Sequence, residues 1–151
     1  MHPRIDHRKV SPKAIEAMFG LERYAEQSVL PKDLLDLVRL RVSQMNGCAY
    51  CIDMHTKDLR AAGESEQRLY LLDAWRESPL YSERERAALA WTEAITLIHE
   101  THAPDEVYEE VRRHFSEQEL VDLTLAIATI NVWNRMAISF RSVHPVRAKA
   151  A

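Results

Sequence analysis

The sequence LVRLRVSQMNGCAYCIDMH, residues 37–55, contains the pattern that decides how we interpret this chain. Its first half places apolar residues at the helical period, and Asn46-Gly47 ends that run. A further helix is expected to begin around Cys48 and to stop at Gly63, because glycine suits the left-handed position after a helix. We therefore predict two consecutive helices, with two cysteines at the start of the second.

Two cysteines and a histidine share one face of that second helix. At the helical period Cys48, Cys51 and His55 fall within one apolar stripe, which continues through Leu59. The i, i+4 spacing brings His55 close enough to Cys51 for direct or water-bridged proton transfer. Cys48 is expected in the first turn, where unpaired backbone N–H groups and the helix dipole favour a thiolate.

This arrangement favours a reactive dithiol. A thiolate attacks a peroxide, and a second thiol nearby can convert the resulting sulfenic acid to a disulfide. We therefore expect mild peroxide to form a Cys48–Cys51 disulfide. The structural alternative is that two buried cysteines and a core histidine share the stripe by chance.

Three other roles of a C-x-x-C pair fit less well. Thioredoxin-like proteins place the pair after a strand, whereas residues 34–45 have a helical period. Covalent haem attachment needs His directly after the second cysteine, where Ile52 stands. Zinc bound by Cys48, Cys51 and His55 would lack a fourth ligand, since there is no second C-x-x-C and no H-x3-H. We expect no metal ion and no cofactor.

The rest of the chain also indicates an all-α fold. No stretch alternates with period two, and the whole sequence has only three glycines. Capping boxes of the form S-x-x-E, together with other helix-start signals, predict helices that begin near Ser11, Pro31, Cys48, Ser65, Ser82, Pro104 and Ser116. The helix from Ser65 is expected to run through Trp75, and the helix from Ser82 to about Thr101. Residues 1–151 are thus expected to form a single domain, a bundle of about six to seven helices.

The last of these helices is apolar around its whole circumference over residues 120–140. A chain of this size can hardly surround such a helix, so we expect a homo-oligomer in which another subunit covers part of it. Trp75, Trp91 and Trp133 are expected in the core or at that interface. His99 and His102, three residues apart near a helix end, are expected at the surface.

Charge and hydropathy exclude several classes of partner. The net charge is −3, and the 20 basic and 23 acidic residues alternate along the chain, so we expect neither nucleic acid nor an anionic membrane as partner. Residues 1–9 lack the apolar segment of a secretory signal, and no apolar run of membrane-spanning length occurs. We therefore expect a cytoplasmic protein, in which a cysteine pair is more often catalytic than structural.

Residues 37–55 resemble the signature stretch of AhpD-like alkylhydroperoxidases in the carboxymuconolactone decarboxylase family. Residues 131–135, Asn-Val-Trp-Asn-Arg, resemble a segment of the last long helix of these proteins, so the resemblance covers most of the chain. It implies an all-α fold that assembles as a trimer or hexamer. It also implies a disulfide-forming cysteine pair that reduces organic hydroperoxides and is regenerated by a thiol or dithiol reductant.

The resemblance assigns a role to each site residue. Cys51 would be the attacking thiol, Cys48 the resolving thiol and His55 the proton relay. Asp36 stands where the family has a glutamate that acts as the base behind the histidine. By position in the helix alone, Cys48 is the better candidate for the low-pKa thiol. Asp36 lies off the apolar face of its helix, so the residues alone favour a solvated surface acid.

Two other functions are alternatives to the peroxidase. The first is a redox-responsive oligomeric scaffold or binding protein, in which the disulfide is a switch and turnover is negligible. The second is a decarboxylase of the kind that names the family, which does not need a dithiol. The Cys48/Cys51 pair favours the peroxidase over the decarboxylase.

Overall fold

The computed structural model describes residues 2–146, and all regular structure in that range is helical. The α-helices are α1 (His7–Val10), α2 (Pro12–Glu26), α3 (Lys32–Asn46), α4 (Ala49–Ala61), α5 (Glu66–Leu71), α6 (Glu83–Thr96), α7 (Ile98–Thr101), α8 (Asp105–His114) and α9 (Glu117–Ser139). A 3₁₀ turn at Leu72–Ala74 follows α5. The predicted all-α class is confirmed, and the helix count within the described residues exceeds the expectation because α1 and α7 are single turns.

Local sequence accounts for most helix ends. Both capping boxes form, since Ser82 and Ser116 each accept the backbone N–H of a glutamate three residues on, and that glutamate bonds back to the serine N–H. Gly47, with φ of 67°, closes α3 in the left-handed region. Ser11 precedes α2 as predicted, although its side chain makes no capping hydrogen bond.

Two predicted helices are shorter than expected. The helix after Ser82 was expected to continue to about Thr101, but it breaks at Leu97 into α6 and α7. The Thr101 hydroxyl donates to the Ala94 carbonyl at 2.7 Å, which supplies a partner for a carbonyl freed by the break. The helix capped by Ser65 changes from α to 3₁₀ geometry at Leu72 instead of continuing to Trp75.

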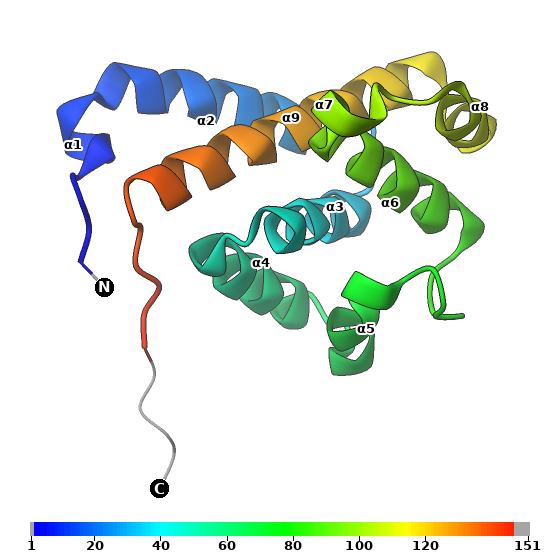
Figure 1. Ribbon diagram of the computed structural model, residues 1–151, viewed down its shortest axis with the longest axis horizontal. Coiled ribbons are helices and arrows are strands. Elements are labelled where there is room, and N and C mark those ends of the chain that lie inside the picture. The colour runs from blue at the N-terminus through cyan, green and yellow to red at the C-terminus, as the bar shows by residue number, and fades with distance from the viewer. Residues whose placement is uncertain (1, 147–151) are drawn as a thin grey trace, which may run out of the picture.

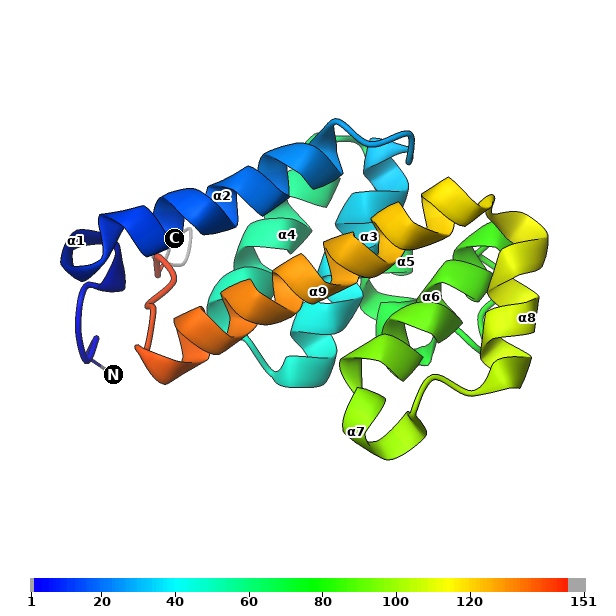
Figure 2. The ribbon, with the colours of Figure 1, turned by 90° about the horizontal axis from the view of Figure 1, so that it is seen from above.

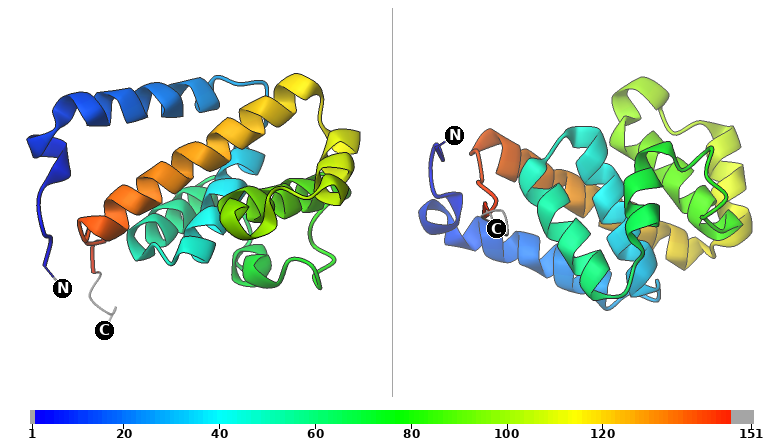
Figure 3. Two further views of the ribbon diagram at one scale, coloured as in Figure 1. Left: turned by 45° about the horizontal axis from the view of Figure 1, so that its top comes forward. Right: turned by 90° about the horizontal axis from the view of Figure 1, so that it is seen from below.

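Helix α3 lies at the centre of the molecule. Figures 1 and 2 show α2 and α9 running antiparallel along one side of it, with α6 and α8 at one end of the molecule and α1 at the other. From below, α4 lies beside α3 (Figure 3). One face of α3 packs Val38 and Val42 against α6 and α9, and another packs Leu37 and Leu40 against Leu59 of α4. Polar residues of α3 are therefore buried as well.

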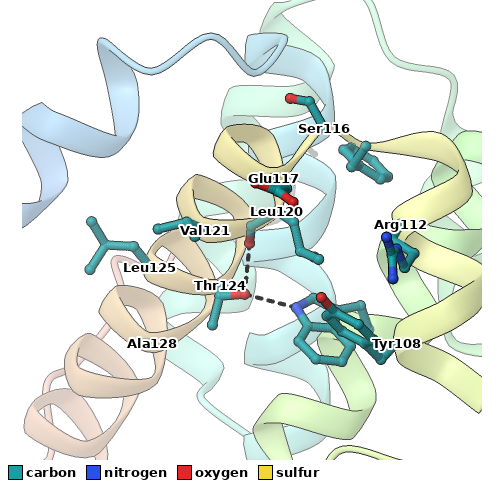
Figure 4. A pocket seen from close by; sticks show the side chains of 11 residues that line it. Tyr108, Arg112, Ser116, Glu117, Leu120, Val121, Thr124, Leu125 and Ala128 are labelled. Carbon is teal, nitrogen blue, oxygen red and sulfur yellow. Dashed lines mark hydrogen bonds between the residues drawn. The ribbon is translucent and has the colours of Figure 1, made fainter. Parts of the chain in front are cut away.

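Helix α9 is only partly covered by this chain. Its inner side is buried, whereas Val121, Val132 and Ile138 are 66%, 40% and 46% exposed. Beside Val121, an open groove of about 760 Å³ runs between α8 and α9, with Tyr108 on its far wall (Figure 4).

The polar atoms of this groove are paired or solvated. The Trp91 indole N–H donates to the Thr124 hydroxyl at 2.9 Å, and that hydroxyl donates to the Leu120 carbonyl at 2.7 Å. Arg112, on the rim, has a side chain 52% exposed. The groove is therefore an apolar surface without a buried ionisable group among its lining residues.

Candidate functional site

Cys48 and Cys51 form a disulfide at the start of α4, with their Cα atoms 5.3 Å apart. Cys48 is the N-cap of the helix, with an extended backbone (φ −82°, ψ 91°), and thus lies just before the first turn in which it was expected. Its Sγ accepts the backbone N–H of Cys51 at 3.3 Å. Both cysteines are buried, at 1% and 3% exposure. The cap position gives the Cys48 sulfur a backbone donor that stabilises negative charge.

An amide cluster holds the turn before Cys48 against α9. The Asn46 side chain donates to the side-chain oxygens of Asn131 at 3.0 Å and Asn134 at 2.9 Å. Asn134 in turn donates to the hydroxyl of Ser43 at 3.2 Å. The residues that resemble the family's last helix therefore hold the end of α3, a role that the sequence alone did not indicate.

His55 lies one turn after Cys51 on the buried face of α4 and is 7% exposed. Its Nε2 atom is buried and has no hydrogen-bond partner among the described residues. Burial, followed by the positive charge of Arg39, lowers the pKa of His55 to about 4, although the carboxylate of Asp36 acts in the opposite direction. His55 is therefore neutral near pH 7, the form that can accept a proton.

Asp36 is buried, at 4% exposure, so the expectation of a solvated surface acid was wrong. Its Oδ1 accepts a hydrogen bond from Arg39 Nη1 at 2.9 Å, and its Oδ2 is ion-paired with Lys32. Asp36 makes no hydrogen bond to His55, and it acts on that ring through its charge. Packing of α3 on all sides buries the carboxylate, and these two cations supply a partner for each of its oxygens.

A cavity of about 250 Å³ brings three of the four predicted site residues together. Cys51, His55 and Asp36 line it, whereas Cys48 does not. The apolar part of the wall comes from three helices and includes Phe19, Met54, Ile130 and Trp133. Thus Cys51 is the cysteine that faces this cavity, which we call the thiol cavity, and Cys48 lies behind Cys51.

Sequence reasoning missed the charged residues that surround Asp36. Lys32 and Arg39 stand four residues before it and three after it, a helical spacing that could have suggested ion pairs. Glu22 of α2 is ion-paired with Arg39, and its other oxygen accepts the indole N–H of Trp133 at 3.1 Å. No local pattern signals Glu22, because its partners lie on other helices.

The other histidines and tryptophans fall largely where they were expected. The side chain of His99 is 73% exposed, and His102 is also at the surface. Trp75 and Trp91 are buried, whereas Trp133 lines the thiol cavity.

Within residues 2–146, no three His, Cys, Asp or Glu side chains are grouped so as to hold a metal ion. None of the helices in that range has the length and apolar character that crossing a membrane requires.

Comparison with known proteins identifies the fold and the family. Residues 11–94 match the model of the carboxymuconolactone decarboxylase family. The chain belongs to this family and is AhpD-like. It is 48% identical over 139 residues to the uncharacterized Bacillus subtilis protein YdfG, covering 92% of this chain and 95% of that protein. The resemblance seen in the sequence is thereby confirmed.

Solved structures agree with this assignment. ATU0492 from Agrobacterium tumefaciens, of unknown function and suggested to be the antioxidant defence protein AhpD, superposes with a TM-score of 0.94 and 50% identity. The match covers 97% of this chain and all of that one. The debrominase Bmp8 matches with a TM-score of 0.79 at 22% identity, over 91% of this chain and 74% of its own, and so shares the fold.

Proposed function

We propose that the chain is a thiol-dependent peroxidase that reduces organic hydroperoxides through the Cys48/Cys51 pair. The observation that carries this proposal is the single cavity in which Cys51, His55 and the buried carboxylate of Asp36 meet, with the disulfide partner directly behind. The cavity position favours Cys51 as the attacking thiol, while the capped sulfur of Cys48 suits a resolving thiol that later leaves as a thiolate.

The proposed cycle begins with the reduced pair. Neutral His55 accepts the Cys51 proton, and the thiolate attacks the terminal oxygen of the hydroperoxide. The O–O bond breaks, the alkoxide takes a proton from His55 and leaves as the alcohol, and Cys51 becomes a sulfenic acid. The Cys48 thiol then attacks that sulfur, water leaves, and the disulfide forms. An external thiol or dithiol reductant returns two electrons and two protons to the pair.

Asp36 supports this cycle through its charge. Burial and Arg39 both reduce the basicity of His55, and Asp36 is the group that raises it. In this proposal Asp36 keeps His55 basic enough to take the thiol proton, which is the role the family gives to glutamate. Lys32 and Arg39 hold the carboxylate in place.

A redox-responsive scaffold is the second candidate, and one observation favours it. The turn that precedes Cys48 is bonded through Asn46 to α9, whose exposed Val121 and Val132 suit a subunit interface. A change in the disulfide could thus reach an assembly surface without turnover. We propose in either case that the chain forms a homo-oligomer, a trimer or hexamer, through this side of α9. A cytoplasmic location stays a prediction.

Peroxide titration with thiol counting and mass analysis tests the chemistry. We expect the reduced protein to lose two hydrogen atoms per equivalent of cumene hydroperoxide and to form the Cys48–Cys51 disulfide. Cys51→Ser should not react, and Cys48→Ser should stop at the sulfenic acid or overoxidise. Progressive overoxidation of the wild type without a disulfide would count against the peroxidase. Stoichiometric oxidation without turnover in the presence of a dithiol would favour the scaffold.

A further inference from the structure

A chain of polar contacts joins the apolar wall of the thiol cavity to its buried carboxylate. The Trp133 indole N–H donates to Glu22 Oε2 at 3.1 Å, and Glu22 Oε1 is ion-paired with Arg39. Arg39 Nη1 then donates to Asp36 Oδ1 at 2.9 Å. The side chains of Arg39 and Asp36 are 5% and 6% exposed, and that of Glu22 is 21% exposed. One carboxylate from α2 therefore bridges the substrate wall on α9 and the charged residues of α3.

We propose that Glu22 is a positioning residue that fixes Trp133 as the wall for the organic group of the hydroperoxide, and so sets the preference for organic peroxides over hydrogen peroxide. This inference rests on the peroxidase function proposed above. Glu22 also lines the cavity, and its polar contacts are to Trp133 and Arg39, so in this proposal it acts through Trp133.

The geometry around Trp133 explains why its orientation matters. Its ring lies 5.2 Å from that of Phe19, at a tilt of 55°, so two aromatic rings from α2 and α9 form one side of the cavity. A ring of this size is held in one orientation by its packing and by the partner of its N–H. Hydrogen peroxide has no organic group to place against such a wall, so loss of the orientation should affect only substrates that have one.

The two contacts of Glu22 can be separated by substitution. Glu22→Gln removes the charge that pairs with Arg39 but keeps a side-chain oxygen able to accept the indole N–H. Glu22→Ala removes both contacts, and Trp133→Phe removes the N–H donor together with the five-membered ring of the indole while keeping a phenyl ring. Glu16→Gln is the matched control, because Glu16 is an exposed glutamate on the same helix and does not line the cavity.

The test compares single-turnover oxidation of the reduced proteins by cumene hydroperoxide and by hydrogen peroxide. We expect the ratio of the two rate constants to fall about tenfold in Glu22→Ala and in Trp133→Phe, the loss expected when a hydrogen bond to a charged group is removed. The ratio should stay within about twofold of wild type in Glu22→Gln and Glu16→Gln. The double variant Glu22→Ala/Trp133→Phe should lose little more than either single variant, because both break the same bond.

A spectroscopic readout reports the contact itself. The Trp133 indole N–H resonance, assigned by its disappearance in Trp133→Phe, should shift and exchange faster with solvent in Glu22→Ala. The resonances of Trp75 and Trp91 should not move, because their donors bond to Glu93 and Thr124 instead. If Glu22→Ala fails to fold, Trp133→Phe alone carries the ratio measurement.

The outcomes separate this inference from the function it rests on. Equal slowing of both peroxides in Glu22→Ala and Trp133→Phe, or an unchanged ratio, would overturn the role of Glu22 and leave the peroxidase standing. A wild type that reacts with neither peroxide would overturn the peroxidase and the selectivity together.

Discussion

Two hollows of the described residues, the groove between α8 and α9 and the thiol cavity, differ in the groups that line them. The groove between α8 and α9 is about three times larger than the thiol cavity, at about 760 against 250 Å³, yet its ionisable side chains lie at the rim. The thiol cavity encloses Asp36, Arg39 and His55, each at least nine-tenths buried. Burying such groups is costly, so they are found where each has a partner or a task. Buried charge, and not volume, is therefore what selects the hollow that we propose as the active site.

The contrast also separates two uses of a surface. An open apolar groove beside a half-covered helix is suited to contact with another protein surface. A narrow cavity lined by a sulfur, a neutral histidine and fixed charges is suited to a small molecule that reacts. The two regions should therefore respond differently to substitution.

The largest effect should come from Asp36 in the thiol cavity. Asp36→Asn removes the charge that supports His55, so peroxide oxidation of the reduced protein should slow by at least about 10²-fold, the lower end of general-base assistance. Asp36→Glu restores the family residue and should retain or raise the rate. Stopped-flow measurement of thiol oxidation from pH 5 to 9 checks both. Asp33→Asn, an exposed acid on the same helix, is the control. Identical profiles for wild type and Asp36→Asn would remove Asp36 from the mechanism.

An intermediate effect should appear in the pH dependence of stability. The pKa of His55 is about 4 in the folded protein, below its ordinary value of 6.5, so the unfolded chain binds the proton more tightly. The contribution of neutral His55 is complete above pH 6.5 and is lost as the pH falls toward 4, by about 3 kcal/mol in total.

Urea unfolding of the disulfide form at pH 7 and pH 4 measures this loss, against His55→Leu as reference and exposed His99→Gln as control. The wild type should lose about 3 kcal/mol more than His55→Leu between these pH values. Equal losses in the two proteins would show that His55 titrates normally.

The smallest effect on chemistry should come from the groove. Val121→Glu places a charge on the exposed side of α9, which should dissociate the expected oligomer while changing the stability of the fold by no more than about 0.5 kcal/mol. The rate of Cys51 oxidation should not change. Light scattering measures the mass, and Val29→Glu, also exposed but outside the groove, is the control. A wild type of 17.5 kDa in solution would contradict the oligomer itself.

The residues around the thiol cavity differ in how far the sequence predicts their positions. The stripe of Cys51, His55 and Leu59 on α4 follows from helical spacing, and the structure buries all three. Asp36 could not be placed in this way, because its burial depends on Glu22 and Arg39 as well as on its own helix. Pattern reasoning assigns each residue to a face of its helix, but it does not show which distant helix covers that face. The break at Leu97 was also missed, and the carbonyl of Ala94 that it frees finds its partner in the hydroxyl of Thr101, seven residues later in the sequence.

The amide cluster at the end of α3 also bears on how the site is made in the cell. Asn46 is separated from Asn131 and Asn134 by 85 and 88 positions, so the turn before Cys48 gains these bonds only after almost the whole chain has been synthesised. During translation the two cysteines are synthesised well before α9. Between the synthesis of the cysteines and the docking of α9, the cavity is incomplete, and the thiols are accessible to oxidants and chaperones. Docking of the last helix is then the step that gives the pair its own environment.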